Sequence, residues 1–237
     1  MKDNKKVDMC NGPILSKMFF YALPIMATGV LQVLYNAADT MVIGQFAGDE
    51  SLAAVAATGA LTNLIVNLFL GIGTGVLAVI ARYIGAKRHG HVKKGVHTSM
   101  LFAVLAGIFL MVFGAVFSGT FLEWMGTGAE AGSTVLPKAT LYMQIYFLGA
   151  PAFLVYNFGA SILRAAGDSK RPLIYLTVSG LLNVLLNLLF VIVFHMDVEG
   201  VAIATIASQY LSAILVVVCL LRESGDIHLN VKQMQNY

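Results

Sequence analysis

The chain has 237 residues, of which 58% are hydrophobic and only 11% are charged, and its net charge is +3. Soluble domains carry roughly 25% charged residues, so this composition argues against a soluble helical core, because too few polar side chains remain to cover it. The basic residues are divided among four short segments without interleaved aromatic residues, which argues against a nucleic-acid-binding surface.

Six apolar segments follow one another, and each is long enough to cross the ~30 Å hydrocarbon core as a helix. They lie near residues 18–45, 52–83, 96–117, 138–163, 173–195 and 201–221. The first two are longer than a bilayer requires, so we expect tilt, a kink or protruding ends. The predicted fold is an all-α polytopic membrane protein: a cytoplasmic segment (1–17), a six-helix transmembrane lobe (18–221) and a cytoplasmic tail (222–237).

Charged residues in the connecting segments predict the orientation of the bundle. Basic residues precede the first span, separate the second from the third and the fourth from the fifth, and follow the sixth. Acidic residues occupy the alternate connections, and Lys138 is the single exception. The positive-inside rule therefore places both termini in the cytoplasm of a multi-pass protein of the cell membrane.

Enzyme chemistry and metal chemistry find no support in the sequence. The thiols Cys10 and Cys219 both fall toward the predicted cytoplasmic side, so neither a disulfide nor a metal cluster is expected. No nucleophile and base occur at a meaningful spacing. We expect neither an enzyme nor a bound cofactor.

Two prolines lie inside or near the membrane portion of predicted spans, where a proline bends a helix. Pro151 in the fourth span is compatible with a packing kink or a functional bend. Pro24 shares its helix with Asp39, and we interpret it as a functional bending point. Gly71, Gly73 and Gly75 lie in the middle of the second span, which favours close helix packing or local unwinding over a phosphate-binding loop.

Asp39 lies in an otherwise apolar segment, residues 19–47. A carboxylate in the bilayer costs at least a few kcal/mol, so an acidic residue there indicates an ion or substrate pathway. Gln32, Tyr35 and Asn36 share one helix face with Asp39, since the four stand at i, i+3, i+4 and i+7. Other spans offer polar side chains that would line the same cavity: Tyr142, Asn157, Asn183, Asn187 and Thr205.

This constellation allows a mechanism based on exchange. Burial favours the neutral form of a carboxyl group, so Asp39 would take a proton from outside and lose it when the cavity faces inward or receives a cation. Sodium is the competing coupling ion, with Asp39, Asn183, Asn187 and Thr205 as oxygen ligands. The remaining alternative is a structural aspartate hydrogen-bonded to Asn36 or Thr40.

An ordered set of motifs resembles the multidrug and toxic compound extrusion (MATE) transporters over nearly the whole chain. In the first half it comprises Pro24 followed by Asp39-Thr40-x-x-Ile43-Gly44, Leu52-Ala53-Ala54-Val55, Gly71-Ile72-Gly73-x-Gly75 and Arg82-x-x-Gly85-Ala86. In the second half it comprises Leu163-Arg164-Ala165-Ala166-Gly167-Asp168-Ser169-Lys170-x-Pro172, Asn183-x-x-x-Asn187 and Gly200-Val201-Ala202-x-Ala204-Thr205.

The resemblance implies the N-terminal lobe of a transporter with two six-helix lobes, which exchanges protons or sodium ions for a cationic, amphipathic compound. It implies that Asp39 is the cation-coupling carboxylate and that Pro24 is the bending point of the first helix. It also implies a surround of hydrogen-bonding side chains for Asp39, to which Tyr142 and Asn157 are the weakest matches. The implied surround is Tyr35, Tyr142, Asn157, Asn183, Asn187 and Thr205.

Two departures from the family pattern limit the comparison. Some members carry a second carboxylate where this chain has Asn187, and an amide cannot take part in a two-acid relay. The chain also has six spans only, so a second lobe or a second copy is the expected partner. The alternatives are a flippase for lipid-linked saccharides, which the absence of Arg and Lys inside the spans disfavours, and an inactive fragment or interaction protein.

Overall fold

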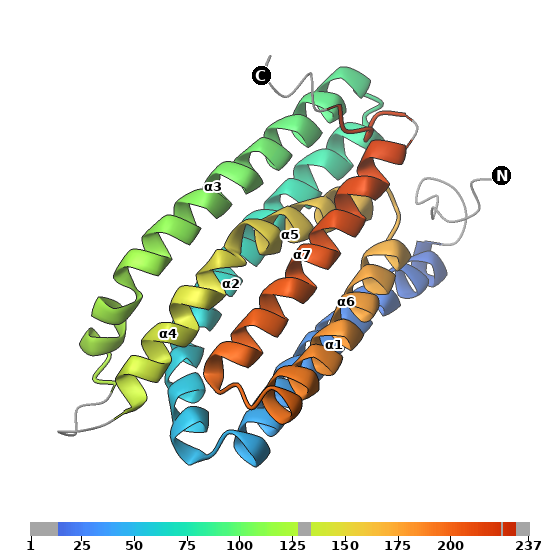
Figure 1. Ribbon diagram of the computed structural model, residues 1–237. Helices are drawn as coiled ribbons and strands as arrows, with labels where there is room; N and C mark the ends of the chain where they lie inside the picture. Colours follow the sequence, from blue (N-terminus) through green and yellow to red (C-terminus); the bar gives the residue numbers. More distant parts are fainter. Residues whose placement is uncertain (1–13, 128–133, 224, 231–237) are drawn as a thin grey trace.

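The computed structural model describes residues 14–127, 134–223 and 225–230. Every regular element in them is helical: α1 (Ile14–Phe46), α2 (Asp49–Gly85), α3 (His89–Trp124), α4 (Val135–Leu148), α5 (Ala150–Ala165), α6 (Lys170–Leu188), the π-helical turn η1 (Leu189–Val193) and α7 (Val198–Arg222). Figure 1 shows an elongated bundle in which α1 lies beside α6, and α5 contacts both α3 and α7. The predicted all-α bundle is confirmed; the predictions that rest on residues 1–13, Cys10 among them, on Glu130 and on Lys232 lie outside the described residues.

The helices carry their apolar side chains outward as well as inward. Five of them are long and apolar enough to cross a membrane, and the bent pair α4–α5 makes a sixth. On α3, Phe109, Val112 and Val116 are 65%, 56% and 66% exposed. Contiguous apolar surface of this kind is rare on soluble monomers, whereas in a bilayer it contacts acyl chains. The outer surface of the bundle is therefore built for lipid.

The fourth span is interrupted where the sequence places Gly149 and Pro151. The axes of α4 and α5 differ in direction by 48° across this break. Pro151 has no N–H to continue the helical hydrogen bonds. Gly107 and Gly114 of α3 hold the bent span closely, because a Cβ at either position would overlap Pro151 or the ring of Phe147. The predicted kink is present, and it turns the fourth span in the middle of the bundle.

The fifth span is not a regular α-helix to its end. After Leu188 the chain continues as η1, where Phe194 N donates to Leu189 O over 3.2 Å, five residues back. His195 then adopts a positive φ of 51°, and Gly200 leaves room for Met196 and Phe190. The sequence predicts one uninterrupted helix here. The π-helical turn directly follows Asn187, and such turns are frequent at functional sites.

The single basic residue among the acidic connections has local partners. Lys138 Nζ lies 2.8 Å from Asp197 Oδ2 and 3.8 Å from Glu50 Oε2, and it donates to Ser51 Oγ over 3.0 Å. This cluster ties the beginnings of α2 and α4 to the connection before α7. Burial of the Asp197 carboxyl opposes its ionisation, but the hydrogen bonds from Lys138 and Ser51 prevail and hold its pKa below the usual range.

The part of the tail that the structure describes packs back onto the lobe. Ile227 and Leu229 are only 4% and 3% exposed and join the apolar cluster that α2, α3, α5 and α7 form. Leu229 N donates to Leu220 O over 3.1 Å, and Asn230 N donates to His97 Nε2 over 3.0 Å. The chain thus stays attached to the bundle beyond the last helix.

Candidate functional site

A cavity of about 220 Å³ opens in the middle of the bundle, and Asp39 is part of its wall. Gln32, Tyr35 and Asn36 line the same cavity, as their shared helix face predicts. The opposite walls come from α2, α4, α5, α6 and α7. None of the described side chains that line this cavity is a Lys or an Arg. The Asp39 carboxylate therefore faces a polar space without a protein cation beside it.

Asp39 is held by the asparagines of α6. Asn187 Nδ2 donates to Asp39 Oδ1, and the same amide lies 3.4 Å from Asn183 Oδ1. Asn183 Nδ2 in turn donates to Thr205 Oγ1 over 3.4 Å, so the chain of contacts reaches α7. Asn187 is fully buried, and its Oδ1 has no hydrogen-bond partner among the described residues. This oxygen belongs to the amide that contacts Asp39, and it is a buried acceptor without a partner among the described residues.

The observed contacts differ from those expected for a structural aspartate that is hydrogen-bonded to Asn36 or Thr40 of its own helix. Thr40 Oγ1 donates over 2.8 Å to the backbone carbonyl of Asn36, not to Asp39. The hydrogen bond to the Asp39 carboxylate comes instead from Asn187, 148 positions along the chain. The geometry joins α1 to α6 through this pair.

Tyrosine rings form much of the remaining wall. Tyr35 packs against Gly180, where a Cβ would overlap its ring, and its hydroxyl lies 3.4 Å from Thr177 O. Tyr142 is 7% exposed and stacks on Tyr146, with the ring centroids 6.1 Å apart. Faces of aromatic rings attract organic cations. The wall thus combines π surface with one carboxylate.

The expected site residues do not all occupy the same position. Tyr35, Asn36, Asp39, Tyr142, Asn157, Asn183 and Thr205 line the cavity, whereas Asn187 lies behind Asp39. Asn157 Nδ2 donates to Phe153 O over 2.8 Å, so its amide is partly used by its own helix. Pro24 is buried in an uninterrupted α1, four helical turns from Asp39, and does not line the cavity.

Sequence reasoning missed several wall residues that helical spacing could have found. Tyr146 follows Tyr142 by four residues, and Gln209 follows Thr205 by four. Gly149 admits Gln209, because a Cβ there would overlap its amide oxygen. Nothing in the sequence indicated Thr62 and Asn63 on α2, since neither stands at helical spacing from a predicted site residue. The missed residues on this wall are Thr62, Asn63, Val66, Tyr146, Phe153, Tyr156, Leu176, Ser179, Gly180, Ser208, Gln209 and Ser212.

The arrangement is suited to binding a positive charge. A carboxylate and several tyrosine rings line a space whose described wall has no Lys or Arg, and an unpartnered amide oxygen of Asn187 lies behind the carboxylate. The described residues contain no group of three His, Cys, Asp or Glu side chains placed to hold a metal ion. The geometry is suited to reversible binding of a cation.

Comparison with known proteins assigns the fold to one family. The MatE family model matches residues 24–189, which is more than half of the chain. A probable multidrug resistance protein of Bacillus subtilis, YpnP, is 32% identical over 206 residues, which cover 86% of this chain and 45% of that protein. An FAD transporter of Shewanella oneidensis is 29% identical over 213 residues, covering 88% and 45%.

The structural likeness is equally extensive. The crystal structure of MATE in the bent conformation superposes with a TM-score of 0.88 at 25% identity, covering 98% of this chain and 51% of that one. The chain therefore spans about half the length of the relatives that it matches. Together with its membrane-spanning helices, these matches identify the chain as a member of the MatE family of multi-pass membrane transporters, equivalent in extent to one six-helix lobe.

Proposed function

We propose that this lobe is the cation-coupling half of an antiporter that exports cationic, amphipathic compounds in exchange for protons or sodium ions. The support is the Asp39 carboxylate, which faces a cavity lined by tyrosines and amides and without Lys or Arg among its described residues. A carboxylate in such surroundings is costly unless a positive partner joins it. Proton, sodium ion and substrate are then alternative partners for one group.

Completion of the transporter requires a second body. Alternating access in transporters of this type comes from two repeats or bundles that move around a central site. A second six-helix lobe is the first candidate, and a second copy of this chain is the other. The proposed membrane is the cell membrane, with the basic connections of the bundle on the cytoplasmic side.

The choice between proton and sodium depends on the oxygens near Asp39. Sodium needs several oxygen ligands, and the unpartnered Asn187 Oδ1 next to the carboxylate would supply one of them. Proton coupling needs the carboxyl group alone. Efflux measured in sodium-free buffer separates the two: export that continues there supports the proton, and export that stops supports sodium.

Transport of an anionic compound fits the site less well. One relative is named an FAD transporter, and the diphosphate of that compound would meet the Asp39 carboxylate with no basic side chain in the described cavity wall to compensate it. A flippase for pyrophosphate-linked saccharides meets the same obstacle. An inactive fragment or interaction protein remains the alternative from another class.

The test is ethidium accumulation in a drug-sensitive, efflux-deficient bacterium that expresses this chain, alone or together with a second MatE lobe. Asp39→Asn should raise accumulation to the level of cells without the transporter, because the amide cannot trade a proton for a cation. The matched control is Asp49→Asn at the exposed start of α2, which should export normally. Export that survives Asp39→Asn contradicts the coupling role.

Direct binding to the purified protein applies even if the lobe cannot transport alone. Tetraphenylphosphonium should bind the wild type and Asp49→Asn with similar affinity and should bind Asp39→Asn at least tenfold more weakly. Equal binding by all three would contradict a cation site at Asp39, and absence of binding by the wild type would favour the fragment interpretation.

A further inference from the structure

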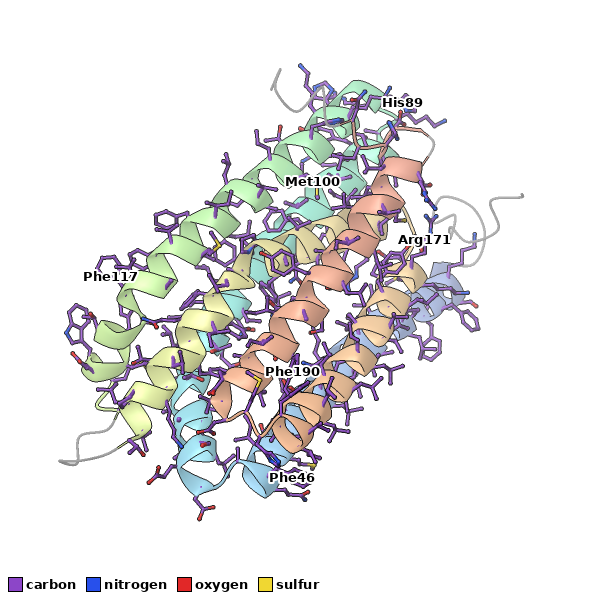
Figure 2. The ribbon with its side chains drawn as sticks, in the orientation of Figure 1. Phe46, His89, Met100, Phe117, Arg171 and Phe190 are labelled. Carbon is purple, nitrogen blue, oxygen red and sulfur yellow. The ribbon has the colours of Figure 1, made fainter. Side chains whose placement is uncertain are left out.

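A second cavity lies at the end of the bundle where α2 meets α3, far along α2 from the Asp39 cavity. Its volume is about 350 Å³, and it is lined by Val79, Arg82, Tyr83, Ala86 and Arg88. This segment contains the Arg-x-x-Gly motif of the sequence, to which the transport site assigns no role. Figure 2 labels His89, the first residue of α3, at this end of the bundle.

The tight turn after α2 brings the two arginines to one cavity. Ala86 N donates to Arg82 O and Arg88 N donates to Tyr83 O, each over 3.0 Å. Lys87 adopts a positive φ of 53°, so the chain reverses at once and Arg88 stays close to the last turn of α2. The ring of Tyr83 lies against the ring of His91, with 5.2 Å between the ring centroids. This contact holds Tyr83, a residue of the cavity wall, against α3.

The positive charge of this cavity has no acidic counterpart in the described part of the chain. The ion pairs found there involve His89, Lys138 and Arg171, not Arg82 or Arg88. The carboxylate of Asp226 contacts His89, which follows Arg88 in the chain. Both arginine side chains are exposed at the cavity. Two guanidinium groups thus stand together at the end of a membrane-spanning helix.

An apolar surface leads from the lipid region directly to these arginines. Leu64, Leu68, Ile72 and Val79 are 68%, 58%, 38% and 51% exposed and follow one another at helical spacing along α2. Val79 also lines the cavity, one turn before Arg82. In a bilayer these side chains contact acyl chains, and the arginines lie where the acyl region gives way to headgroups.

We propose that this cavity binds an anionic phospholipid, with its headgroup phosphate between Arg82 and Arg88 and an acyl chain along Val79, Ile72 and Leu68. The guanidinium fork matches the phosphate group in geometry and charge. Basic pockets at helix ends are established sites for anionic lipid headgroups in membrane proteins. Aromatic residues such as Tyr83 are typical of the same interfacial layer. The site is independent of Asp39 and of the transported compound.

The test measures retention of phosphatidylglycerol and of phosphatidylcholine by the purified full chain in detergent, using native mass spectrometry. Arg82→Gln and Arg88→Gln should each weaken phosphatidylglycerol binding roughly fivefold, which corresponds to about 1 kcal/mol for each basic residue near a membrane surface. The matched control is Lys87→Gln, which removes the same charge from the same turn but lines no part of the cavity. It should change binding less than twofold.

Each other outcome decides against the proposal. Equal losses in all three variants would show diffuse attraction, and equal retention of phosphatidylcholine and phosphatidylglycerol by the wild type would show no headgroup selection. Displacement of the lipid by an equal concentration of inorganic phosphate would show a free-anion site. The Gln variants should unfold at the wild-type temperature, because both arginines are exposed. If a Gln variant unfolds at a lower temperature, the charge-retaining variants Arg82→Lys and Arg88→Lys provide a second measurement. They should bind phosphatidylglycerol more tightly than the Gln variants.

Discussion

Asp39 and Asp168 are two acidic residues inside the helical bundle, and they differ in whether a basic side chain contacts the carboxylate. Asp168 has no exposed surface; its Oδ1 accepts from Lys170 N and Arg171 N over 3.1 Å each, and its Oδ2 contacts Arg171 Nε. Asp39 faces the cavity and receives the Asn187 amide, but no Arg or Lys stands in the described wall. One carboxylate is neutralised by the protein, and the other is not.

We propose that the difference separates a structural acid, Asp168, from an exchangeable one, Asp39. Arg171 also donates to Glu223 Oε2 over 2.7 Å, so the Asp168 corner joins the start of α6 to the end of α7. Breaking a buried ion pair leaves a charge without compensation, which destabilises the fold. Removing the charge of Asp39 leaves no Lys or Arg of the described cavity wall unpaired. Substitution of Asp168 should therefore lower stability, whereas substitution of Asp39 should abolish transport.

The largest effect on stability should follow Asp168→Asn. Arg171, whose side chain is 19% exposed, would keep Glu223 but lose its contact with the buried Asp168, and breaking a pair of this kind costs about 3 kcal/mol of unfolding free energy. Reversible unfolding in detergent measures it, with Asp49→Asn as the control that should change by less than about 0.5 kcal/mol. A loss for Asp168→Asn no larger than that of the control would erase the distinction between the two regions.

Gly180→Ala should have the next largest effect, and it sharpens the comparison from the cavity side. The added methyl group would overlap the Tyr35 ring, and overpacking of this kind costs about 2 kcal/mol. Binding of tetraphenylphosphonium should weaken as well, since Tyr35 is part of the cavity wall.

Gly59→Ala is the matched control for this substitution. Its Cβ meets no atom within 4 Å, so the change should be neutral or stabilising by about 0.5 kcal/mol. Equal behaviour of the two variants would show that α1 and α6 do not pack closely at Tyr35.

A smaller effect should follow Lys138→Met at the opposite end from Asp168. Lys138 and Asp197 are 29% and 33% exposed, so solvent weakens their pairing and the expected loss is about 1 kcal/mol. The folded-state pKa of Asp197 is lowered, so its contribution is present above about pH 4 and is lost as the pH falls through that folded pKa.

The difference between wild type and Lys138→Met, measured from unfolding curves at several pH values, should therefore shrink below about pH 4. A difference that persists unchanged to pH 2 would assign the effect to packing of the Lys138 stem instead of to the ion pair.

The sequence predicted the helices and the Asp39 face because both depend on local periodicity. Gln32, Tyr35, Asn36 and Asp39 share a face on any α-helix, whatever surrounds it. The pairing of Asn187 with Asp39 was expected only as a shared cavity, since it depends on how α1 packs against α6. The π-helical turn after Asn187 left no mark in the apolar sequence of residues 189–193. Lys138 was an exception to the predicted charge pattern, because its partners Asp197 and Ser51 are distant in the sequence and meet it only in the folded bundle.

The most direct test of the exchange at Asp39 is infrared difference spectroscopy of the purified protein as sodium, protons or tetraphenylphosphonium are added. The wild type should show carboxyl and carboxylate bands that change on addition of a cation, and these changes should be absent from Asp39→Asn but present in Asp49→Asn. Spectra of the wild type that do not respond to any of the three cations, or that respond equally in Asp39→Asn, would contradict the account.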